Sequence, residues 1–262
     1  MKRLFAAIRF LTILPLPGGG SDTDDIFRGI VPMFPLVGLL IGGIMLALAM
    51  LLGWVFTPMV LAVLLVLLMI AISGGLHMDG LADTADGFFS SRPRERVLEI
   101  MKDSHIGTMG VLAIVAVVLL KVSMLVTITQ LQVLGLEVYK AEQIPFIVFL
   151  MPVAGRCALV LGINLLPPAR TDGGLGQLFC GRRSSIQIVW AVTVLFASAW
   201  FALEWLGLVA ALLTLPAVIL FSVYCYRKIG GATGDTLGAA CELAETTILL
   251  GLFVAPYVMQ WI

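Results

Sequence analysis

The sequence has little charge for its length. Of its 262 residues 12% are Asp, Glu, Lys or Arg, whereas 60% are hydrophobic, and the mean hydropathy is +1.08. These values lie outside the range of soluble globular proteins and predict a chain that crosses a membrane several times. Sixteen basic residues balance sixteen acidic ones, so no excess of positive charge favours a nucleic acid, and we expect no such partner.

Paired cysteines and a signal-peptide cleavage site are also lacking. The four cysteines, at 157, 180, 225 and 241, form no CxxC pair, which argues against a disulfide framework or a zinc site. Residues 1–17 combine a basic start with a short apolar run, but no small-x-small cleavage site follows. We therefore expect a retained amphipathic segment that lies in the membrane interface.

Long apolar runs dominate the rest of the chain. A helix needs roughly 20 residues to cross the hydrocarbon core, and about seven runs approach that length. The sequence thus predicts an all-α, polytopic membrane helix bundle with short cytoplasmic helices, built as a single catalytic domain over residues 1–262. The expected spans are 30–52, 55–72, 109–128, 144–166, 186–203, 206–225 and 246–262.

Basic residues alternate between the connecting segments. They precede the first span and follow the second, fourth and sixth, whereas the opposite connections hold only Lys140. Because basic residues remain in the cytoplasm, the N-terminus and the two segments 73–108 and 226–245 are expected on the cytoplasmic side. The expected location is the bacterial inner membrane, with the lipid bilayer as one partner.

Acidic residues gather in the first of these segments. If residues 76–88 are helical, Asp79, Asp83 and Asp86 share one face. Their mutual repulsion would be reversed by a divalent cation, and carboxylate oxygens suit Mg²⁺. The alternative is a solvated acidic helix end, although acidic residues do little to set membrane topology.

A second acidic cluster lies in residues 230–245, where Asp235 is expected to cap a helix that carries Glu242 and Glu245. The seven-residue spacing from Asp235 to Glu242 repeats that from Asp79 to Asp86. We therefore predict that Asp79, Asp83, Asp86, Asp235 and Glu242 converge on one cation or on a pair of cations.

Basic side chains near the first cluster could hold phosphate groups, or they could simply anchor the loop on the cytoplasmic side. These are Arg92, Arg94, Arg96 and Lys102.

Within the expected spans lie two basic residues, Lys121 and Arg156. Their charges would cost free energy in the hydrocarbon core unless they were paired. They could hold an anionic substrate or an acidic cluster, or they could bond to hydroxyl groups and backbone carbonyls.

Two weaker signals concern a base and a loop. His77 adjoins the acidic cluster and could act as a base, although such histidines are more often hydrogen-bonding neighbours. Residues 173–183, rich in glycine and ending in two arginines, could cover a nucleotide phosphate, but they match no phosphate-binding motif and fit a plain flexible loop better.

Small residues such as Gly38 and Gly42 allow close helix contacts, within the chain or between copies in a homo-oligomer.

Three motifs together resemble one enzyme family. GGLHMDGLADTADG, MKDSHIGTMG and GGATGDTLGAACELAE, in this order, are similar to the cobalamin synthases, the adenosylcobinamide-GDP ribazoletransferases. The resemblance covers essentially the whole chain and implies a Mg²⁺-dependent enzyme of the bacterial inner membrane. Its substrates would be adenosylcobinamide-GDP and α-ribazole or α-ribazole 5′-phosphate, with GMP released at the last assembly step of the B12 nucleotide loop.

Phosphoryl transfer of this kind needs cations and an oriented nucleophile, and we assign Asp103 as a base or further ligand. One alternative is a phospholipid-forming phosphotransferase that uses CDP-alcohols, whose motif is only partly matched because no arginine follows Ala82 or Ala85. A second is an ion-coupled transporter, whose acidic residues would be expected near the membrane midplane.

Overall fold

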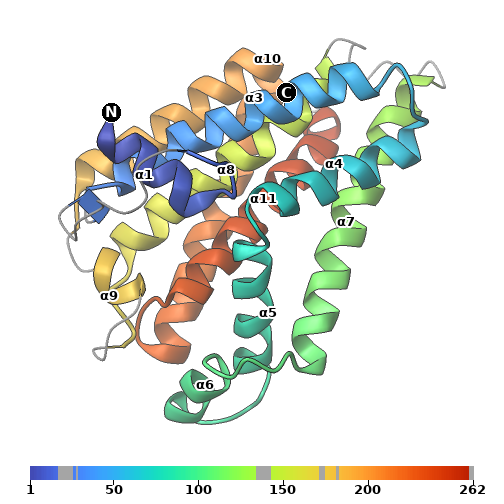
Figure 1. Ribbon diagram of the computed structural model, residues 1–262. Helices are drawn as coiled ribbons and strands as arrows, with labels where there is room; N and C mark the ends of the chain where they lie inside the picture. The colour runs from blue at the N-terminus through green and yellow to red at the C-terminus, as the bar shows by residue number, and fades with distance from the viewer. Residues whose placement is uncertain (17–25, 28, 134–142, 171–174, 181–182, 260–262) are drawn as a thin grey trace.

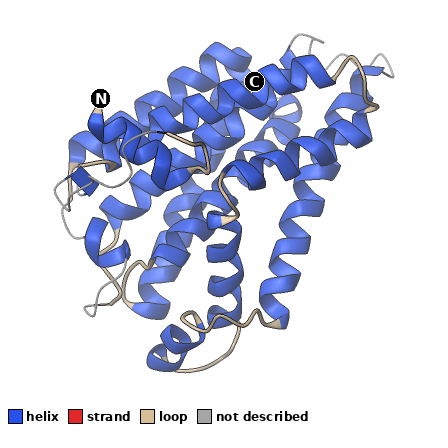
Figure 2. Cartoon of the chain, viewed as in Figure 1, coloured by secondary structure: helices blue, strands red, loops and turns tan. Residues whose placement is uncertain are grey.

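The computed structural model describes residues 1–16, 26–27, 29–133, 143–170, 175–180 and 183–259, and these contain helices and no strand (Figure 2). The expected all-α fold is therefore confirmed. The helices are α1 (Lys2–Leu11), the 3-10 helix η1 (Val31–Met33), α3 (Phe34–Leu52), α4 (Pro58–Ile72), α5 (Leu76–Phe88), α6 (Arg94–Ile100), α7 (Thr108–Val133), α8 (Ile144–Leu165), α9 (Leu175–Phe179), α10 (Ser185–Ile229) and α11 (Gly234–Met259).

Five helices of the described chain are long and apolar enough to cross a membrane, so the polytopic class is confirmed. They are α3 with η1, α7, α8, α10 and α11. The pair α4 and α5 passes the same test only when joined across an 89° bend. The count of seven is thus not confirmed, and we treat the short, acidic α5 as lying outside the spans.

The long helix α10 is interrupted at its middle. Leu203 and Glu204 have non-helical backbone angles, and Glu204 has a positive φ of 50°. A Cβ atom on Gly207 would collide with the carbonyl of Ala199, because the chain turns back at this break. The break lies between the two spans predicted at 186–203 and 206–225.

A glycine pair produces the bend between α4 and α5. Gly74 and Gly75 have φ angles of 61° and 75°, in the left-handed region that glycine adopts without steric cost. The amide of Gly75 donates to the Ile70 carbonyl at 3.0 Å and so closes the turn. Because of this turn α5 leaves the direction of α4 and lies beside α11 and α7 (Figure 1).

The core lies around α8, which is buried over most of its length and contacts α3, α10 and α11. Gly38 and Gly42 allow α3 to approach α8, because a Cβ atom on either would meet the backbone of α8. These two glycines therefore serve a contact within the chain.

The N-terminal helix α1 is amphipathic as predicted, but its apolar side packs against protein. Ala6, Ala7 and Leu11 are buried, and Phe10 stacks on Phe34 of α3 with ring centroids 6.1 Å apart. The expectation that this segment only lies in the interface is thus incomplete, because α1 also closes part of the core.

Candidate functional site

The two acidic motifs meet because α5 and α11 pack directly on each other. A Cβ atom on Gly80 would lie 2.7 Å from the carbonyl oxygen of Asp235, and one on Gly238 would lie 3.2 Å from that of His77. Two glycines thus allow the backbones to approach closely. This contact brings Asp79 and Asp235, which lie far apart in the sequence, to one place.

Asp83 shows that the carboxylates interact. Burial, followed by repulsion from three neighbouring carboxylates, raises the pKa of Asp83 to about 7, and Arg170 acts in the opposite direction. The neighbours are Asp79, Asp235 and Asp86. Such a cluster is expected to attract a cation, since a positive charge favours the ionised carboxylates.

Asp235 does not cap its helix, contrary to the prediction. The hydroxyl of Thr233 accepts from the amide of Thr236 at 3.2 Å, and the hydroxyl of Thr236 accepts from the amide of Thr233 at 2.9 Å. These reciprocal bonds satisfy the first turn of α11. Asp235, bonded to the Thr233 hydroxyl at 3.2 Å, therefore keeps a carboxylate oxygen for other partners.

Asp86 lies near the cluster but its oxygens are already bonded. They accept from the amides of Gly107 and Gly110 at 2.7 and 2.8 Å, at the start of α7. A Cβ atom on either glycine would collide with the carboxylate. We therefore correct the assignment of Asp86 as a metal ligand: it holds the N-terminus of α7, where the helix dipole favours negative charge.

Glu242 belongs to a different cluster. Lys121 of α7 donates to Glu242 and to Glu245, each at 2.7 Å, and Arg156 of α8 donates to Glu245 at 2.5 Å. All four side chains are buried. Glu242 is thus paired with Lys121 and is not brought to Asp79, and of the two alternatives for Lys121 and Arg156 the structure shows the contact with an acidic cluster.

Two of the four basic residues predicted to bind phosphate, Arg94 and Arg96, have other contacts. Arg94 donates to the carbonyls of Ile229 and Ala169, at 2.8 and 2.5 Å, and so ties α6 to the ends of two other segments. Arg96 pairs with Glu99 at 2.6 Å on the surface. Arg92 is exposed and lines no described cavity. Lys102 borders a polar groove and stays a candidate.

Arg170 is the basic residue that the structure places at the acidic cluster, and the sequence analysis missed it. It interacts electrostatically with Asp83 and Asp235. Its Nη2 donates to the Leu98 carbonyl at 2.8 Å, whereas its buried Nε has no partner among the described residues. Arg170 follows Pro167 and Pro168 directly after an expected span. In the sequence this position indicated only on which side of the membrane the residue lies.

Backbone bonds fix Arg170 beside α11. The amide of Ala169 donates to the Ala232 carbonyl at 2.9 Å, and the amide of Ala232 donates to the Pro167 carbonyl at 2.8 Å. Gly231 permits this contact, because a Cβ atom there would collide with the Pro167 carbonyl. The segment after α8 and the segment before α11 are thus joined next to the acidic cluster.

Asp103 lies apart from the cluster, so its assignment as the base is not supported. Its exposed carboxylate bonds to Nδ1 of His105 at 2.7 Å. This hydrogen bond lowers the pKa of Asp103 and raises that of His105. A carboxylate with a lowered pKa is a weaker base, which is the opposite of what general base catalysis requires.

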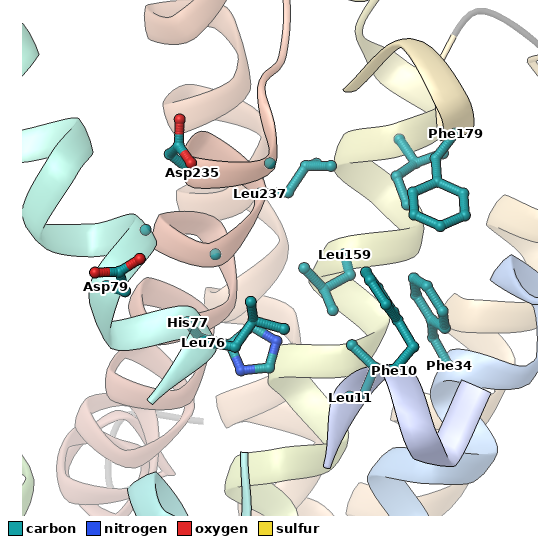
Figure 3. A pocket seen from close by; sticks show the side chains of 14 residues that line it. Phe10, Leu11, Phe34, Leu76, His77, Asp79, Leu159, Phe179, Asp235 and Leu237 are labelled. Carbon is teal, nitrogen blue, oxygen red and sulfur yellow. The ribbon is translucent and has the colours of Figure 1, made fainter. Parts of the chain in front are cut away.

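A cavity adjoins the acidic cluster (Figure 3). Asp79 and Asp235 border one side, Phe10, Phe34 and Phe179 line the other, and His77 lies between them. The cavity volume is about 80 Å³. Part of the segment expected as a plain loop thus forms α9, which supplies Phe179; residues 173–174 and 181–182 of that segment lie outside the described residues.

His77 borders this cavity and is 2% exposed. Burial, together with the charges of Arg156 and Lys121, lowers its pKa well below the usual value, so the imidazole is neutral. Its Nε2 has no hydrogen-bond partner within the described chain. His77 thus borders the cavity and carries a buried polar atom without a described partner.

A larger, open groove lies on another side of Asp79. It is bordered by the α4–α5 turn, by Met78 and Ala82 of α5 and by Ile114 of α7, and its volume is about 660 Å³. Asp79 borders both this groove and the cavity. The acidic cluster is thus accessible from two spaces.

The donor set suits a hard divalent cation, but it is not assembled as a metal site. Asp79, Asp83 and Asp235 offer oxygen atoms and repel one another, as a magnesium site would require. Nevertheless, in the described part of the chain no three His, Cys, Asp or Glu side chains converge closely enough to hold an ion. The chemistry of the residues fits Mg²⁺, and a bound ion would have to draw the carboxylates together.

Comparison with known proteins identifies the family. Residues 3–253 match the family described as cobalamin-5-phosphate synthase. The chain belongs to this family. The cobalamin-5-phosphate synthase match spans the residues that line the cavity and those of the acidic cluster.

Curated relatives agree with the family over almost their full lengths. A protein of Desulfitobacterium hafniense is 38% identical, and one of Clostridium acetobutylicum is 39% identical; these alignments cover 98% of this chain and 98% and 97% of the relatives. A Roseiflexus protein is 40% identical over 94% of this chain and 87% of its own length. All three are named adenosylcobinamide-GDP ribazoletransferase. No solved structure gives a significant match.

Proposed function

We propose that this chain is an adenosylcobinamide-GDP ribazoletransferase. It transfers the adenosylcobinamide phosphate group to α-ribazole, or to α-ribazole 5′-phosphate, and releases GMP. The name shared by the curated relatives supports this assignment. The structural observation that carries it is the meeting of two distant acidic motifs, on α5 and α11, at one cavity.

The reaction breaks a phosphoanhydride bond and forms a phosphodiester bond. A ribose hydroxyl of the acceptor attacks the phosphorus that carries the cobinamide arm, a new O–P bond forms, and the P–O bond to GMP breaks. The hydroxyl loses its proton, and the electron pair of the broken bond leaves with GMP. The protein has to orient the hydroxyl and to offset the negative charge of the phosphates.

We assign Asp79, Asp83 and Asp235 as the residues that hold Mg²⁺. Their mutual repulsion, and the position of Asp79 and Asp235 beside the cavity, support this choice. When bound, the ion would offset charge on the phosphate oxygens. Asp86 and Glu242 are left out of this set because their oxygens bind backbone amides and Lys121.

Arg170 is our candidate for orienting the diphosphate of the donor. It lies near Asp83 and Asp235, and its Nε lacks a partner among the described residues. Arginine binds phosphate oxygens through paired N–H groups. Lys102 borders the groove that Arg170 also lines and could add a second positive charge there.

We place the site at the cytoplasmic face of a bacterial inner membrane. The basic residues that flank the spans support this orientation. A cytoplasmic site would allow the soluble nucleotide GMP to leave directly into the cell.

The decisive experiment uses purified protein in lipid nanodiscs with adenosylcobinamide-GDP, α-ribazole and Mg²⁺. We expect GMP and a complete corrinoid in equal amounts, and neither with the Asp83→Asn variant. Absence of both products with folded wild-type protein would overturn the assignment.

The two alternatives gain nothing from the comparisons. CDP-alcohol chemistry would release CMP, which the same assay detects. A transporter is disfavoured because the charges within the spans, Lys121 and Arg156 with Glu242 and Glu245, are paired with one another. Substrate uptake into vesicles without nucleotide release would favour the transporter.

A further inference from the structure

The far side of the cavity is an aromatic wall built from three separate elements. Phe10 of α1 lies edge-on to Phe179 of α9, with ring centroids 5.5 Å apart, and Phe34 of α3 lies 6.1 Å from each of them. All three line the cavity (Figure 3). Aromatic walls of this kind favour flat, apolar rings, which stack or meet them edge-on.

Polar groups at the cavity are few and lie in defined places. Asp79 and Asp235 border the side of the acidic cluster, and the remaining walls are mostly Leu, Ile and Phe. Between them lies His77, whose Nε2 is buried and has no partner in the described chain. Buried polar atoms in proteins are nearly always hydrogen-bonded, so this atom is expected to bond to a ligand.

The chemistry of this space distinguishes the two bases that take part in the proposed reaction. Guanine carries several donors and acceptors on its edges, and most of them would be left unsatisfied between Phe and Leu side chains, at a cost of about 1–3 kcal/mol each. The benzimidazole base of ribazole has one ring nitrogen free for hydrogen bonding. Besides the two carboxylates that the proposed metal site uses, His77 is the polar side chain in the described lining of this cavity, and its ring can donate to that single nitrogen.

We propose that this cavity binds the benzimidazole base of the acceptor nucleoside. The ring lies against the aromatic wall formed by Phe10, Phe34 and Phe179. His77, in its Nε2–H tautomer, donates to the free ring nitrogen. The ribose then points toward Asp79 and Asp235, where the transfer takes place. This inference rests on the proposed function and assigns one of its two substrates to a subsite.

The test separates the KM values of the two substrates. Phe10→Leu and Phe179→Leu keep apolar volume but remove a ring, and His77→Phe removes the hydrogen bond. In each variant we expect the KM for α-ribazole to rise about tenfold and the KM for adenosylcobinamide-GDP to stay within about twofold. His77→Gln, which retains an N–H donor, should recover part of the loss.

Phe5→Leu is the matched control. Phe5 lies on the same helix as Phe10, is 40% exposed and does not line the cavity, so both KM values should remain those of the wild type. If the cavity binds guanine instead, the variants will raise the KM for the donor and weaken inhibition by GMP. That result, or unchanged KM values for both substrates, would overturn the inference.

A binding measurement distinguishes failure of this inference from failure of the proposed function. Equilibrium binding of α-ribazole to folded protein is measured without the donor, in the wild type and in Phe179→Leu and His77→Phe. We expect about tenfold weaker binding in the variants. Wild-type protein that binds α-ribazole in this way but forms no product would refute the function and leave the subsite in place. Turnover by a wild type whose α-ribazole binding is insensitive to both substitutions would refute the subsite alone.

Discussion

Asp83 is expected to make the stability of the protein depend on pH. Its pKa is raised to about 7 in the folded state, by burial and by neighbouring carboxylates, whereas an unfolded aspartate titrates near 4. The folded state therefore binds the proton of Asp83 more tightly than the unfolded state does. As the pH rises from about 4 to about 7, the contribution of Asp83 lowers the free energy of unfolding. With metal removed by EDTA, Asp83→Asn should thus gain thermal stability over the wild type at pH of about 8 and show little difference at about 4.

The measurement is the melting temperature of both proteins across this pH range, in detergent with EDTA. Added Mg²⁺ should raise the melting temperature of the wild type more than that of Asp83→Asn. A variant that is less stable than the wild type at high pH would contradict the argument, because it would mean that Asp83 is favourably paired.

Glu245 should be among the residues whose substitution destabilises the fold most. It accepts from both Lys121 and Arg156, and it is 1% exposed. Removing its charge leaves a buried cation without compensation, at a cost of ~3–5 kcal/mol. We expect Glu245→Gln to lower the melting temperature and the yield of folded protein. Thr247→Val, on the same helix and half-buried, is the control; an equal loss in both would refute the role of the ion pair.

At the scale of elements, the contact between α5 and α11 should control activity. A side chain at Gly80 would displace the backbone of Asp235, so Gly80→Val should separate the acidic motifs and reduce kcat at least about a hundredfold, because small displacements of reacting groups are costly. Gly43→Ala is the matched control, since a Cβ atom there meets nothing within 4 Å. Steady-state rates at saturating Mg²⁺ check both variants, and full activity in Gly80→Val would contradict the proposed site.

Several helices could be predicted from the sequence, but the count of spans, the short helix α9 and the contacts between helices could not. The helix expected at 76–88 matches α5, because its bounds follow from local signals such as the preceding glycine pair. Periodicity also put Asp79, Asp83 and Asp86 on one face. It could not show that Asp86 would bind the start of α7, since that contact depends on how two helices pack.

The same limit explains Glu242 and Arg170. Glu242 follows Asp235 by seven residues, as Asp86 follows Asp79, and this spacing alone suggested that Glu242 is a metal ligand. The cation that Glu242 binds is Lys121, which lies on a helix more than a hundred residues earlier in the chain. Arg170 is brought to the acidic cluster by backbone bonds between two segments, and no local pattern predicts such bonds. The aromatic wall was missed for the same reason, because its rings come from α1, α3 and α9.

For the whole molecule, the proposed orientation predicts which surfaces are accessible from each side of the membrane. Glu99 of α6 should face the cytoplasm, and Trp54, which is 91% exposed in the turn after α3, should face the opposite side. The four native cysteines are buried, so a thiol reagent should react little with them and the background labelling should be low. A membrane-impermeant thiol reagent should label Trp54→Cys in spheroplasts and Glu99→Cys only in inverted vesicles. The reverse pattern would contradict the orientation.

The buried charges also constrain how the protein is made. Lys121 and Arg156 leave the ribosome well before Glu242 and Glu245, which belong to the last helix of the described chain. During synthesis, α7 and α8 therefore carry uncompensated cations into the bilayer, or wait beside the insertion machinery, until α11 arrives. A nascent chain that stops short of α11 should then be an early substrate for membrane proteases, so the synthesis of α11 acts as a checkpoint for this enzyme.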